Sequence, residues 1–252
     1  MQIEGKKAVV FGGASGMGRA TAELFASKGA SVAVLDREGS DGPEVAKALG
    51  GTFMPVDVLD YAGTEQALDD AVTALGGLDI SVTTAGGGIA KRIVSKDGPH
   101  DLDEFRQVLD LNIVATFNIT RLAAFRMTQN EPEDDERGVI VNTSSIAAYE
   151  GQIGQVAYTA AKAAIAAITL PAARDLGSLG VRVTAIAPSL FETGVMKMMP
   201  EEMKTTLVRD NAFPKRMGRP EEYARLALAI VENPMLNGQC IRLDAGVRFA
   251  PK

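Results

Sequence analysis

Short apolar runs, rich in valine and isoleucine, recur along the chain, and between them the apolar residues are spaced as on one face of a helix. Seven runs have the length and β-branched composition of buried strands: residues 7–11, 31–35, 52–56, 78–83, 139–141, 181–187 and 239–243. Strands that alternate with helices predict a parallel sheet covered by helices on both faces. The chain has no repeats or low-complexity stretches, so we expect one α/β domain over residues 1–252, with a doubly wound, seven-stranded parallel sheet.

A glycine-rich turn, GGASGMG at residues 12–18, lies between the first predicted strand and the first predicted helix. This order is typical of dinucleotide binding, because the glycines permit a tight turn and let a pyrophosphate approach the helix N-terminus. The spacing of Gly12, Gly16 and Gly18 is G-x-x-x-G-x-G rather than G-x-G-x-x-G. A glycine turn alone is only a turn; with both flanks present we predict phosphate binding.

Acidic residues end the second and third predicted strands. Asp36 can accept hydrogen bonds from the adenosine ribose and would repel a 2′-phosphate, which favours NAD over NADP. Arg37 leaves the alternative open, because a guanidinium could bind that phosphate. Asp57 could reach the adenine edge, or it could cap the helix that begins near Tyr61. After the fourth strand, residues 84–88 form a second place where the backbone can approach a ligand.

The fifth strand is followed by a polar cluster and then by a predicted helix that carries Tyr158 and Lys162. These residues are four apart, so on a helix they lie one turn above each other on the same face. A free phenol titrates at about pH 10, too high for acid–base work at neutrality, and a nearby ammonium lowers that pKa. Ser145 follows the strand end and could hydrogen-bond the oxygen that Tyr158 protonates. The alternative is a solvated lysine beside a helix tyrosine; the other motifs favour a catalytic pair.

Three further features carry open interpretations. Asn112 falls on the apolar side of a helix predicted over residues 102–127, where it is either a satisfied buried amide or a local break that holds a water beside Lys162. His100, the only histidine, lies in a segment without clear periodicity, and we expect a solvated side chain. The methionines at 196, 198, 199 and 203 lie in an irregular segment after the sixth strand and suit an adaptable lid over an apolar substrate.

Composition and charge narrow the range of partners. The chain has 26 Lys and Arg against 32 Asp and Glu, a net charge of −6, and no basic run, so neither nucleic acid nor a membrane surface is an expected partner. No uninterrupted apolar run reaches the roughly 18 residues of a membrane-spanning helix, and the N-terminal residues enter a strand pattern without a leader. Cys240 is the only cysteine, so we expect no disulfide, no metal site, and a reducing, cytoplasmic setting.

In order and spacing, these motifs resemble those of the classical short-chain dehydrogenase/reductases, and the resemblance covers essentially the whole chain. It is carried by the glycine turn, the two strand-end aspartates, Asn112, Ser145 and the Tyr158-x-x-x-Lys162 pair. Within the family, residues 137–164 and 236–246 are most similar to the type-2 3-hydroxyacyl-CoA dehydrogenases, which also oxidise some hydroxysteroids and other secondary alcohols. The resemblance implies a Rossmann-type fold and reversible hydride transfer between NAD(H) and a secondary alcohol or ketone, foremost a 3-hydroxyacyl-CoA of fatty-acid metabolism.

The resemblance also implies roles for individual residues. Tyr158 would be the general acid/base, Lys162 would lower its pKa and bind the nicotinamide ribose, Ser145 would steady the substrate oxygen, and Asn112 would hold the water of a proton relay. A homotetramer is implied, with the two long helices at its main interface. The implied cofactor contacts are Gly12, Ser15, Gly16, Met17, Gly18, Asp36, Asp57, Val58, Thr84, Ala85, Gly86, Tyr158, Lys162, Pro188, Phe191 and Thr193.

Three positions depart from the family pattern: Phe11 replaces a threonine, Thr83-Thr84 replaces an Asn-Asn pair that braces the central sheet, and Ser189 replaces a glycine. They affect the seating of the nicotinamide and leave the four catalytic residues intact. The competing predictions are an NADPH-dependent 3-oxoacyl-carrier-protein reductase, a hydroxysteroid dehydrogenase and a non-catalytic dinucleotide-binding protein.

Overall fold

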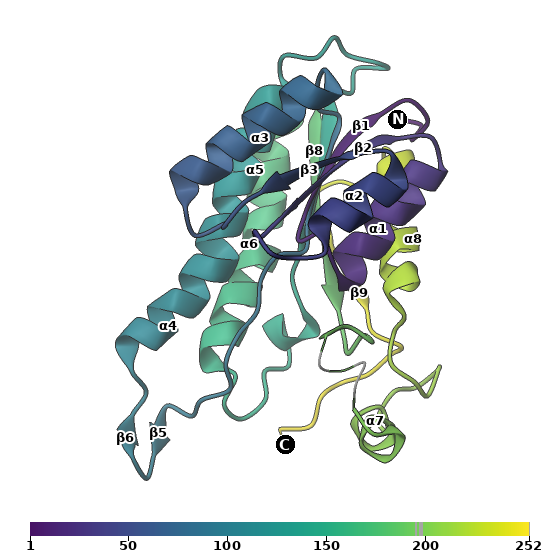
Figure 1. Ribbon diagram of the computed structural model, residues 1–252. Helices are drawn as coiled ribbons and strands as arrows, with labels where there is room; N and C mark the ends of the chain where they lie inside the picture. The colour runs from purple at the N-terminus through teal and green to yellow at the C-terminus, as the bar shows by residue number, and fades with distance from the viewer. Residues whose placement is uncertain (195, 197–198, 252) are drawn as a thin grey trace.

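The predicted parallel sheet is confirmed in the computed structural model, which describes residues 1–194, 196 and 199–251 (Figure 1). Seven strands pair in the order β3-β2-β1-β4-β7-β8-β9, and every neighbouring pair is parallel. Their bounds are β1 (Lys7–Phe11), β2 (Ser31–Asp36), β3 (Thr52–Pro55), β4 (Ile80–Thr83), β7 (Gly138–Thr143), β8 (Val181–Pro188) and β9 (Cys240–Leu243). The chain reverses direction across the sheet between β1 and β4, and the carboxyl ends of these two strands are where such folds bind their ligands.

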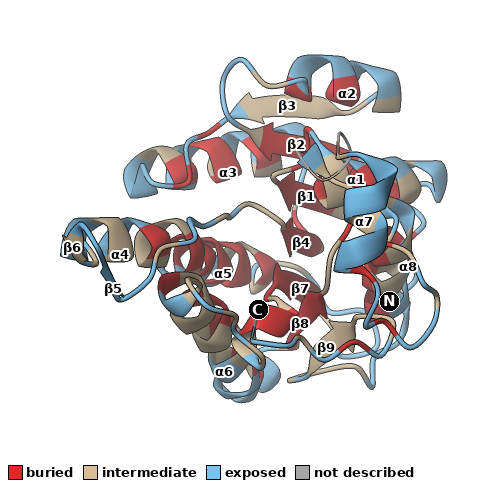
Figure 2. Ribbon diagram, turned by 90° about the horizontal axis from the view of Figure 1, so that it is seen from below, coloured by how far each residue is buried: buried red, intermediate tan, exposed pale blue. Residues whose placement is uncertain are grey.

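Helices cover both faces of the sheet because successive strand residues point to opposite sides. Val10 and Val141 pack on one side, in a cluster with residues of α1 (Gly16–Ser27), α2 (Gly42–Leu49) and α8 (Pro220–Glu232). Val9 and Ile140 pack on the other side, with residues of α3 (Tyr61–Leu75), α5 (Ala115–Met127) and α6 (Val156–Gly177). Figure 2 shows the buried strands between these two helical layers.

The segment before the fourth helix forms an arm that the periodicity did not predict. Two short antiparallel strands, β5 (Val94–Ser95) and β6 (Gly98–Pro99), project beside α4 (Leu102–Leu109) at the edge of the molecule (Figure 1). His100 lies at the base of this arm, packed edge-on against Phe105, and neither of its ring nitrogens has a partner among the described residues. The expectation of a solvated histidine is therefore wrong.

The long helix predicted over residues 102–127 is interrupted by a π-helical turn at Asp110–Val114, between α4 and α5. By length and composition, the helical segments Leu102–Met127 and Val156–Gly177 could each cross a membrane, which the search for uninterrupted apolar runs missed. Both pack against the sheet, and apolar residues of both belong to the cores described above. A short helix, α7 (Glu201–Leu207), includes Met203, so the methionine-rich segment is not irregular throughout; Met198 lies outside the described residues.

Candidate active site

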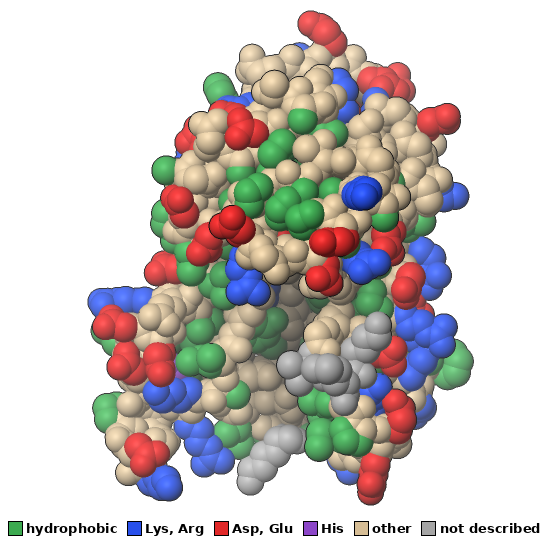
Figure 3. Space-filling model, in the orientation of Figure 1, with side chains coloured by type: hydrophobic (Ala, Val, Ile, Leu, Met, Phe, Trp, Pro, Cys, Tyr) green, Lys and Arg blue, Asp and Glu red, His purple; other side chains and the backbone are tan. Residues whose placement is uncertain are grey.

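Two cavities that share part of their lining lie at the carboxyl ends of the central strands. The first has a volume of about 460 Å³ and the second about 250 Å³, and the hollow they form is visible in the middle of Figure 3. Residues predicted from the sequence line the first cavity: Gly12, Ser15, Gly16, Met17, Asp36, Asp57, Val58, Thr84, Ala85, Gly86 and Thr193. Others line the second: Ser145, Tyr158, Lys162, Pro188 and Phe191. Gly18 and Asn112 line neither and lie behind the cavity walls.

The glycine turn has the backbone conformation that the predicted phosphate site requires. Gly12 and Gly16 have φ values of 78° and 52°, which side-chain-bearing residues rarely adopt. A Cβ on Gly18 would lie 2.2 Å from the carbonyl oxygen of Gly12, so Gly18 is needed where α1 packs against the turn. Ser15 is the N-cap of α1, and its side chain accepts no backbone N–H of the first turn. The helix N-terminus can therefore hold an anion, which fits the pyrophosphate of a dinucleotide.

The two strand-end aspartates are held in different ways. Asp36 accepts the backbone N–H of Ala14 at 2.9 Å and that of Arg37 at 2.8 Å, which fixes its carboxylate in the first cavity. Asp57 lies in the same lining but does not cap α3. The N-cap of that helix is Asp60, whose side chain accepts the N–H of Gly63 at 3.0 Å. The capping interpretation of Asp57 is therefore wrong; its side chain lies in the cavity lining, where Oδ1 accepts the N–H of Leu59 at 3.0 Å.

The predicted catalytic pair meets at the floor of the second cavity. Lys162 is 3% exposed, and its Nζ lies 5.7 Å from the centre of the Tyr158 ring. The ammonium donates to the carbonyl oxygen of Thr143 at 2.9 Å, at the end of β7. Ser145 begins a 3₁₀ turn (Ile146–Ala148), in which its Oγ accepts the N–H of Ala147 at 3.1 Å. Strand β7 and helix α6 thus bring the three side chains together.

Burial sets the pKa values of this pair. It raises the pKa of Tyr158, and the hydroxyl of Ser145, in the same cavity lining, opposes that rise. It also lowers the pKa of Lys162 to about 8. The four-residue spacing predicts that Lys162 lowers the pKa of Tyr158, but within the chain itself burial is the larger influence, because the ammonium is directed at Thr143. Stabilisation of the phenolate therefore falls to Ser145 in the protein alone.

Asn112 occupies the π-helical turn and links it to the active-site glycines. Its Oδ1 accepts the N–H of Gly87 at 3.2 Å, and its Nδ2 donates to the carbonyl oxygens of Gly87 and Val108 at 2.6 and 2.8 Å. A Cβ on Gly86 would lie 2.7 Å from Asn112 Oδ1 and 3.2 Å from Lys162 Nζ, so both groups face the same glycine. The amide is satisfied and the helix is broken at the same place, so the buried amide and the local break are both confirmed, and the water beside Lys162 stays a prediction.

Thr143 contributes to the site in a way that no sequence pattern predicted. Besides binding Lys162 through its carbonyl, Thr143 donates its hydroxyl to the carbonyl oxygen of Thr83 at 2.5 Å and accepts from the buried Tyr223 of α8 at 2.7 Å. Backbone carbonyls exist at every position, so no sequence signal identifies the one that holds an ammonium. The alternation of the buried β7 strand places the Thr143 side chain on the face towards α8.

The Thr83-Thr84 departure is compensated in part. The hydroxyl of Thr84 lies 3.1 Å from the carbonyl oxygen of Phe11 and 3.2 Å from that of Gly12, so it braces the glycine turn. The hydroxyl of Thr83 has no partner among the described residues, and neither does Oδ1 of Asn142, its neighbour in the register of β4 and β7. The threonine pair therefore stabilises the glycine turn through Thr84 but adds no side-chain hydrogen bond from Thr83 inside the sheet, among the residues described.

The fold and these residues define the class of protein. Residues 6–204 match the short chain dehydrogenase family, and the chain belongs to it. It is an oxidoreductase that acts on CH–OH groups, with a nicotinamide dinucleotide as cofactor.

Comparison with individual proteins shows which members of the family the chain is similar to. The chain is 48% identical to a 3-hydroxyacyl-CoA dehydrogenase type-2 of Drosophila melanogaster, over 99% of this chain and 100% of the relative. The crystal structure of 3-hydroxyacyl-CoA dehydrogenase type-2 from Mycobacterium avium superposes with a TM-score of 0.93 at 41% identity, over 98% of both chains. A 7α-hydroxysteroid dehydrogenase complexed with NADH and 7-oxo glycochenodeoxycholic acid has a TM-score of 0.87 at 28% identity, over 98% of this chain and 96% of that one.

Proposed function

We propose that the chain transfers a hydride reversibly between NAD(H) and a 3-hydroxyacyl-CoA or 3-oxoacyl-CoA. The observation that carries the proposal is the convergence of Ser145, Tyr158 and Lys162 on the floor of a cavity continuous with the glycine turn. The choice of substrate follows the name shared by the two similar type-2 relatives.

The chain's own residues supply the proton transfer. In the oxidative direction Tyr158, as phenolate, takes the hydroxyl proton, and the Ser145 hydroxyl donates to the same substrate oxygen. A positioned acid or base of this kind contributes about 10²–10⁴-fold to the rate. Lys162 holds the nicotinamide ribose, and Asn112 fixes the glycines beside it and holds the water of a proton relay. The bound cofactor supplies the hydride acceptor, and no metal takes part in the proposed reaction.

The preference for NAD over NADP rests on Asp36. Its carboxylate is fixed in the first cavity by two backbone N–H groups, where it can accept from ribose hydroxyls and repel a 2′-phosphate. The runner-up is an NADPH-dependent 3-oxoacyl-carrier-protein reductase, which Arg37, in the same cavity lining, favours. Reduction of acetoacetyl-CoA followed with NADH and with NADPH decides between them, and a clear preference for NADPH would reject the NAD assignment.

The remaining alternatives differ in substrate or deny catalysis. A panel of acyl-CoAs, acyl-carrier thioesters and hydroxysteroids, with turnover measured by NADH absorbance, ranks these three substrate classes. Turnover of no member would favour a non-catalytic dinucleotide-binding protein, against which the intact set of Asn112, Ser145, Tyr158 and Lys162 argues. If hydroxysteroids are the best substrates, the acyl-CoA assignment is wrong while the hydride chemistry stands.

We also propose a homotetramer and a cytoplasmic setting. Phe117 and Phe125 on α5 are 56% and 61% exposed, and Leu170 on α6 is 43% exposed, an apolar surface that a monomer would leave in water. The small side chains of α6 allow close helix approach at such an interface: Ala160, Ala163, Ala164 and Ala167. Sedimentation equilibrium tests the assembly, and a monomer mass would refute it. The free thiol of Cys240 agrees with a reducing compartment.

A further inference from the structure

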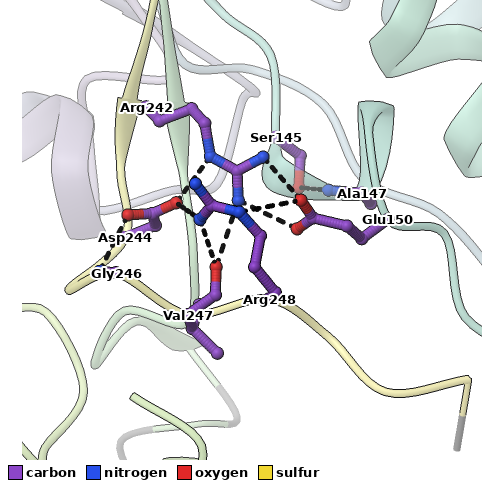
Figure 4. Close-up of polar contacts among 8 residues, drawn as sticks. All are labelled: Ser145, Ala147, Glu150, Arg242, Asp244, Gly246, Val247 and Arg248. Atoms are coloured by element: carbon purple, nitrogen blue, oxygen red, sulfur yellow. Dashed lines mark hydrogen bonds and ion pairs between the residues drawn. The ribbon is translucent and has the colours of Figure 1, made fainter. Parts of the chain in front are cut away.

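A cluster of ion pairs ties the end of the chain to the loop that follows Ser145 (Figure 4). Arg242 of β9 donates to both carboxylate oxygens of Glu150, at 2.8 and 2.9 Å, in a bidentate pair. The same guanidinium donates to Asp244 at 2.6 Å and to the carbonyl oxygen of Val247 at 3.1 Å. Arg248 also reaches Asp244, at 3.1 Å, and Glu150, at 3.4 Å. The Arg242 and Glu150 side chains are 22% and 21% exposed, so the central pair is shielded from most solvent.

Glu150 is directly connected to the turn that begins with Ser145. Its backbone N–H donates to the carbonyl oxygen of Ile146 at 3.0 Å, and that of Tyr149 donates to the same oxygen at 2.9 Å. The Arg242 guanidinium also lies 5.2 Å from the centre of the Tyr149 ring. Arg242 therefore contacts two consecutive residues, Tyr149 and Glu150, whose backbone N–H groups close the turn that begins at Ser145.

The rest of this loop is attached to the same part of the chain. The Gln152 side chain donates to the carbonyl oxygen of Ala250 at 3.1 Å, and the backbone N–H of Ile153 donates to that of Pro251 at 3.1 Å. The residues between the 3₁₀ turn and α6 have no regular secondary structure to hold them. Their position depends on the C-terminal residues and on Lys91, whose backbone N–H donates to the carbonyl oxygen of Gly154 at 2.7 Å. Among the C-terminal contacts, the Arg242–Glu150 pair is attached to the part of the loop that lies nearest to Ser145 in sequence.

We propose that Arg242, through its ion pair with Glu150, is a positioning residue that keeps Ser145 in the lining of the second cavity, beside Tyr158. The inference rests on the catalytic roles proposed above for Ser145 and Tyr158. Arg242 touches neither the cavity lining nor the reacting atoms; it acts by fixing the turn from which Ser145 projects. A planar fork that binds one carboxylate through two parallel bonds fixes orientation as well as distance, which a lysine cannot do.

The effect on catalysis has a definite sign. The Ser145 hydroxyl, which lines the second cavity together with Tyr158, favours the phenolate of Tyr158 and lowers its pKa against the opposing effect of burial. Among the described residues, the charged group that faces this phenol is Lys162. Its ammonium donates to the carbonyl oxygen of Thr143, and this hydrogen bond does not involve Arg242. When the Ser145 turn loosens, the pKa of Tyr158 therefore rises, and alcohol oxidation needs a higher pH.

The test compares Arg242→Gln, Glu150→Gln and the double variant with the wild type, in both directions, with acetoacetyl-CoA and 3-hydroxybutyryl-CoA. We expect each single variant to lower kcat about tenfold, because small displacements of a catalytic group cost up to about 10²-fold, with the KM for NAD unchanged. The rise of kcat/KM with pH in the oxidative direction, which reports the enzyme before the Ser145 hydroxyl donates to the substrate oxygen, should move to higher pH. The double variant should be no slower than the slower single one, since both remove one contact, and Arg242→Lys should recover only part of the rate.

A matched control separates positioning from stability. Arg126 of α5 pairs with Asp69 of α3 at 2.6 Å, partly buried and remote from the Ser145 loop. Arg126→Gln should lower the Tm without moving kcat or the pH profile. If Arg242→Gln and Glu150→Gln behave in the same way, their role is structural and the proposal is wrong. Where Arg242→Gln does not fold, Glu150→Gln decides alone.

Two further variants keep this outcome apart from the proposed function. Ser145→Ala and Tyr158→Phe should abolish most turnover if the proposed mechanism holds. Loss of activity in these two, with wild-type kinetics in the Arg242 and Glu150 variants, rejects only the positioning role. Wild-type activity in Tyr158→Phe rejects the mechanism itself.

Discussion

Gly18→Ala is the sharpest test of how the glycine turn builds the cofactor site. The added Cβ would lie 2.2 Å from the carbonyl oxygen of Gly12 and 2.5 Å from Oγ1 of Thr84. Ordinary contact between non-bonded heavy atoms begins at about 3.5 Å, so the shortfall to the Gly12 oxygen exceeds about 1 Å. The Thr84 side chain can rotate, but the Gly12 oxygen belongs to the backbone of the turn itself. The turn must therefore move away from α1.

The cost of this displacement has two parts. Overpacking a well-packed site costs about 1–3 kcal/mol, which for a chain of this size lowers the Tm by about 2–12 °C. A turn that has moved also loses alignment with the pyrophosphate. Losing one hydrogen bond to a charged group costs at least about 1.5 kcal/mol, so the KM for NAD should rise about tenfold.

Thermal unfolding with and without NAD, together with the KM for NAD, measures both parts. Gly177→Ala at the end of α6 is the matched control, because a Cβ there meets nothing within 4 Å and φ is not in the left-handed region. It should be neutral, or stabilising by up to about 1 kcal/mol. If Gly18→Ala keeps both the Tm and the KM for NAD of the wild type, the packing of α1 on the turn does not shape the cofactor site.

Three further substitutions test the cofactor preference, the departure in β4 and the buried ammonium. Asp36→Asn removes the charge that repels a 2′-phosphate, so the ratio of kcat/KM with NADH to that with NADPH should fall about tenfold; an unchanged ratio would show that Asp36 does not set the preference. Thr83→Val replaces an unpartnered hydroxyl with a methyl group of similar size, so urea unfolding should show equal or greater stability; a clear loss would mean that the hydroxyl is bonded. Burial lowers the pKa of Lys162 from 10.5 to about 8, so between these pH values the folded chain has released a proton that the unfolded chain retains, and stability should rise with pH relative to Lys162→Met. A difference that stays constant over this range would contradict the lowered pKa.

Much of the fold could be predicted because its strands are buried on both faces. Such strands read as continuous β-branched runs, and the predicted seven-stranded parallel sheet was confirmed. The β5–β6 arm left no such signal, since its apolar residues Ile93 and Val94 are 65% and 68% exposed. The π-helical turn was anticipated only as a break at Asn112, because a shift of backbone hydrogen bonds leaves no mark in composition.

Features of the candidate site that depend on the identity of a side chain could be predicted from the sequence. Features that depend on a backbone carbonyl or on burial could not. Tyr158 and Lys162 follow from spacing, but the carbonyl of Thr143 that binds the ammonium does not. The direction of the Tyr158 pKa depends on burial, which only tertiary packing determines. Asp57 and Asp60 are both suitable N-caps three residues apart, and the backbone of Asp60, extended at φ −85° and ψ 94°, decides between them.

The π-helical turn at Asp110–Val114 also limits how this part of the chain can vary in length. A π-turn holds one residue more than the α-helical register requires, so losing a single residue there would leave an unbroken and better-bonded helix. Such a deletion would rotate α4 by about 100° relative to α5. Val108, which packs with Ala157 and Ala161 of α6, would turn away from them, and Asn112 would leave the glycines it holds. A shortening that improves the helix would thus dismantle the site, which makes the surplus residue a functional part of the molecule.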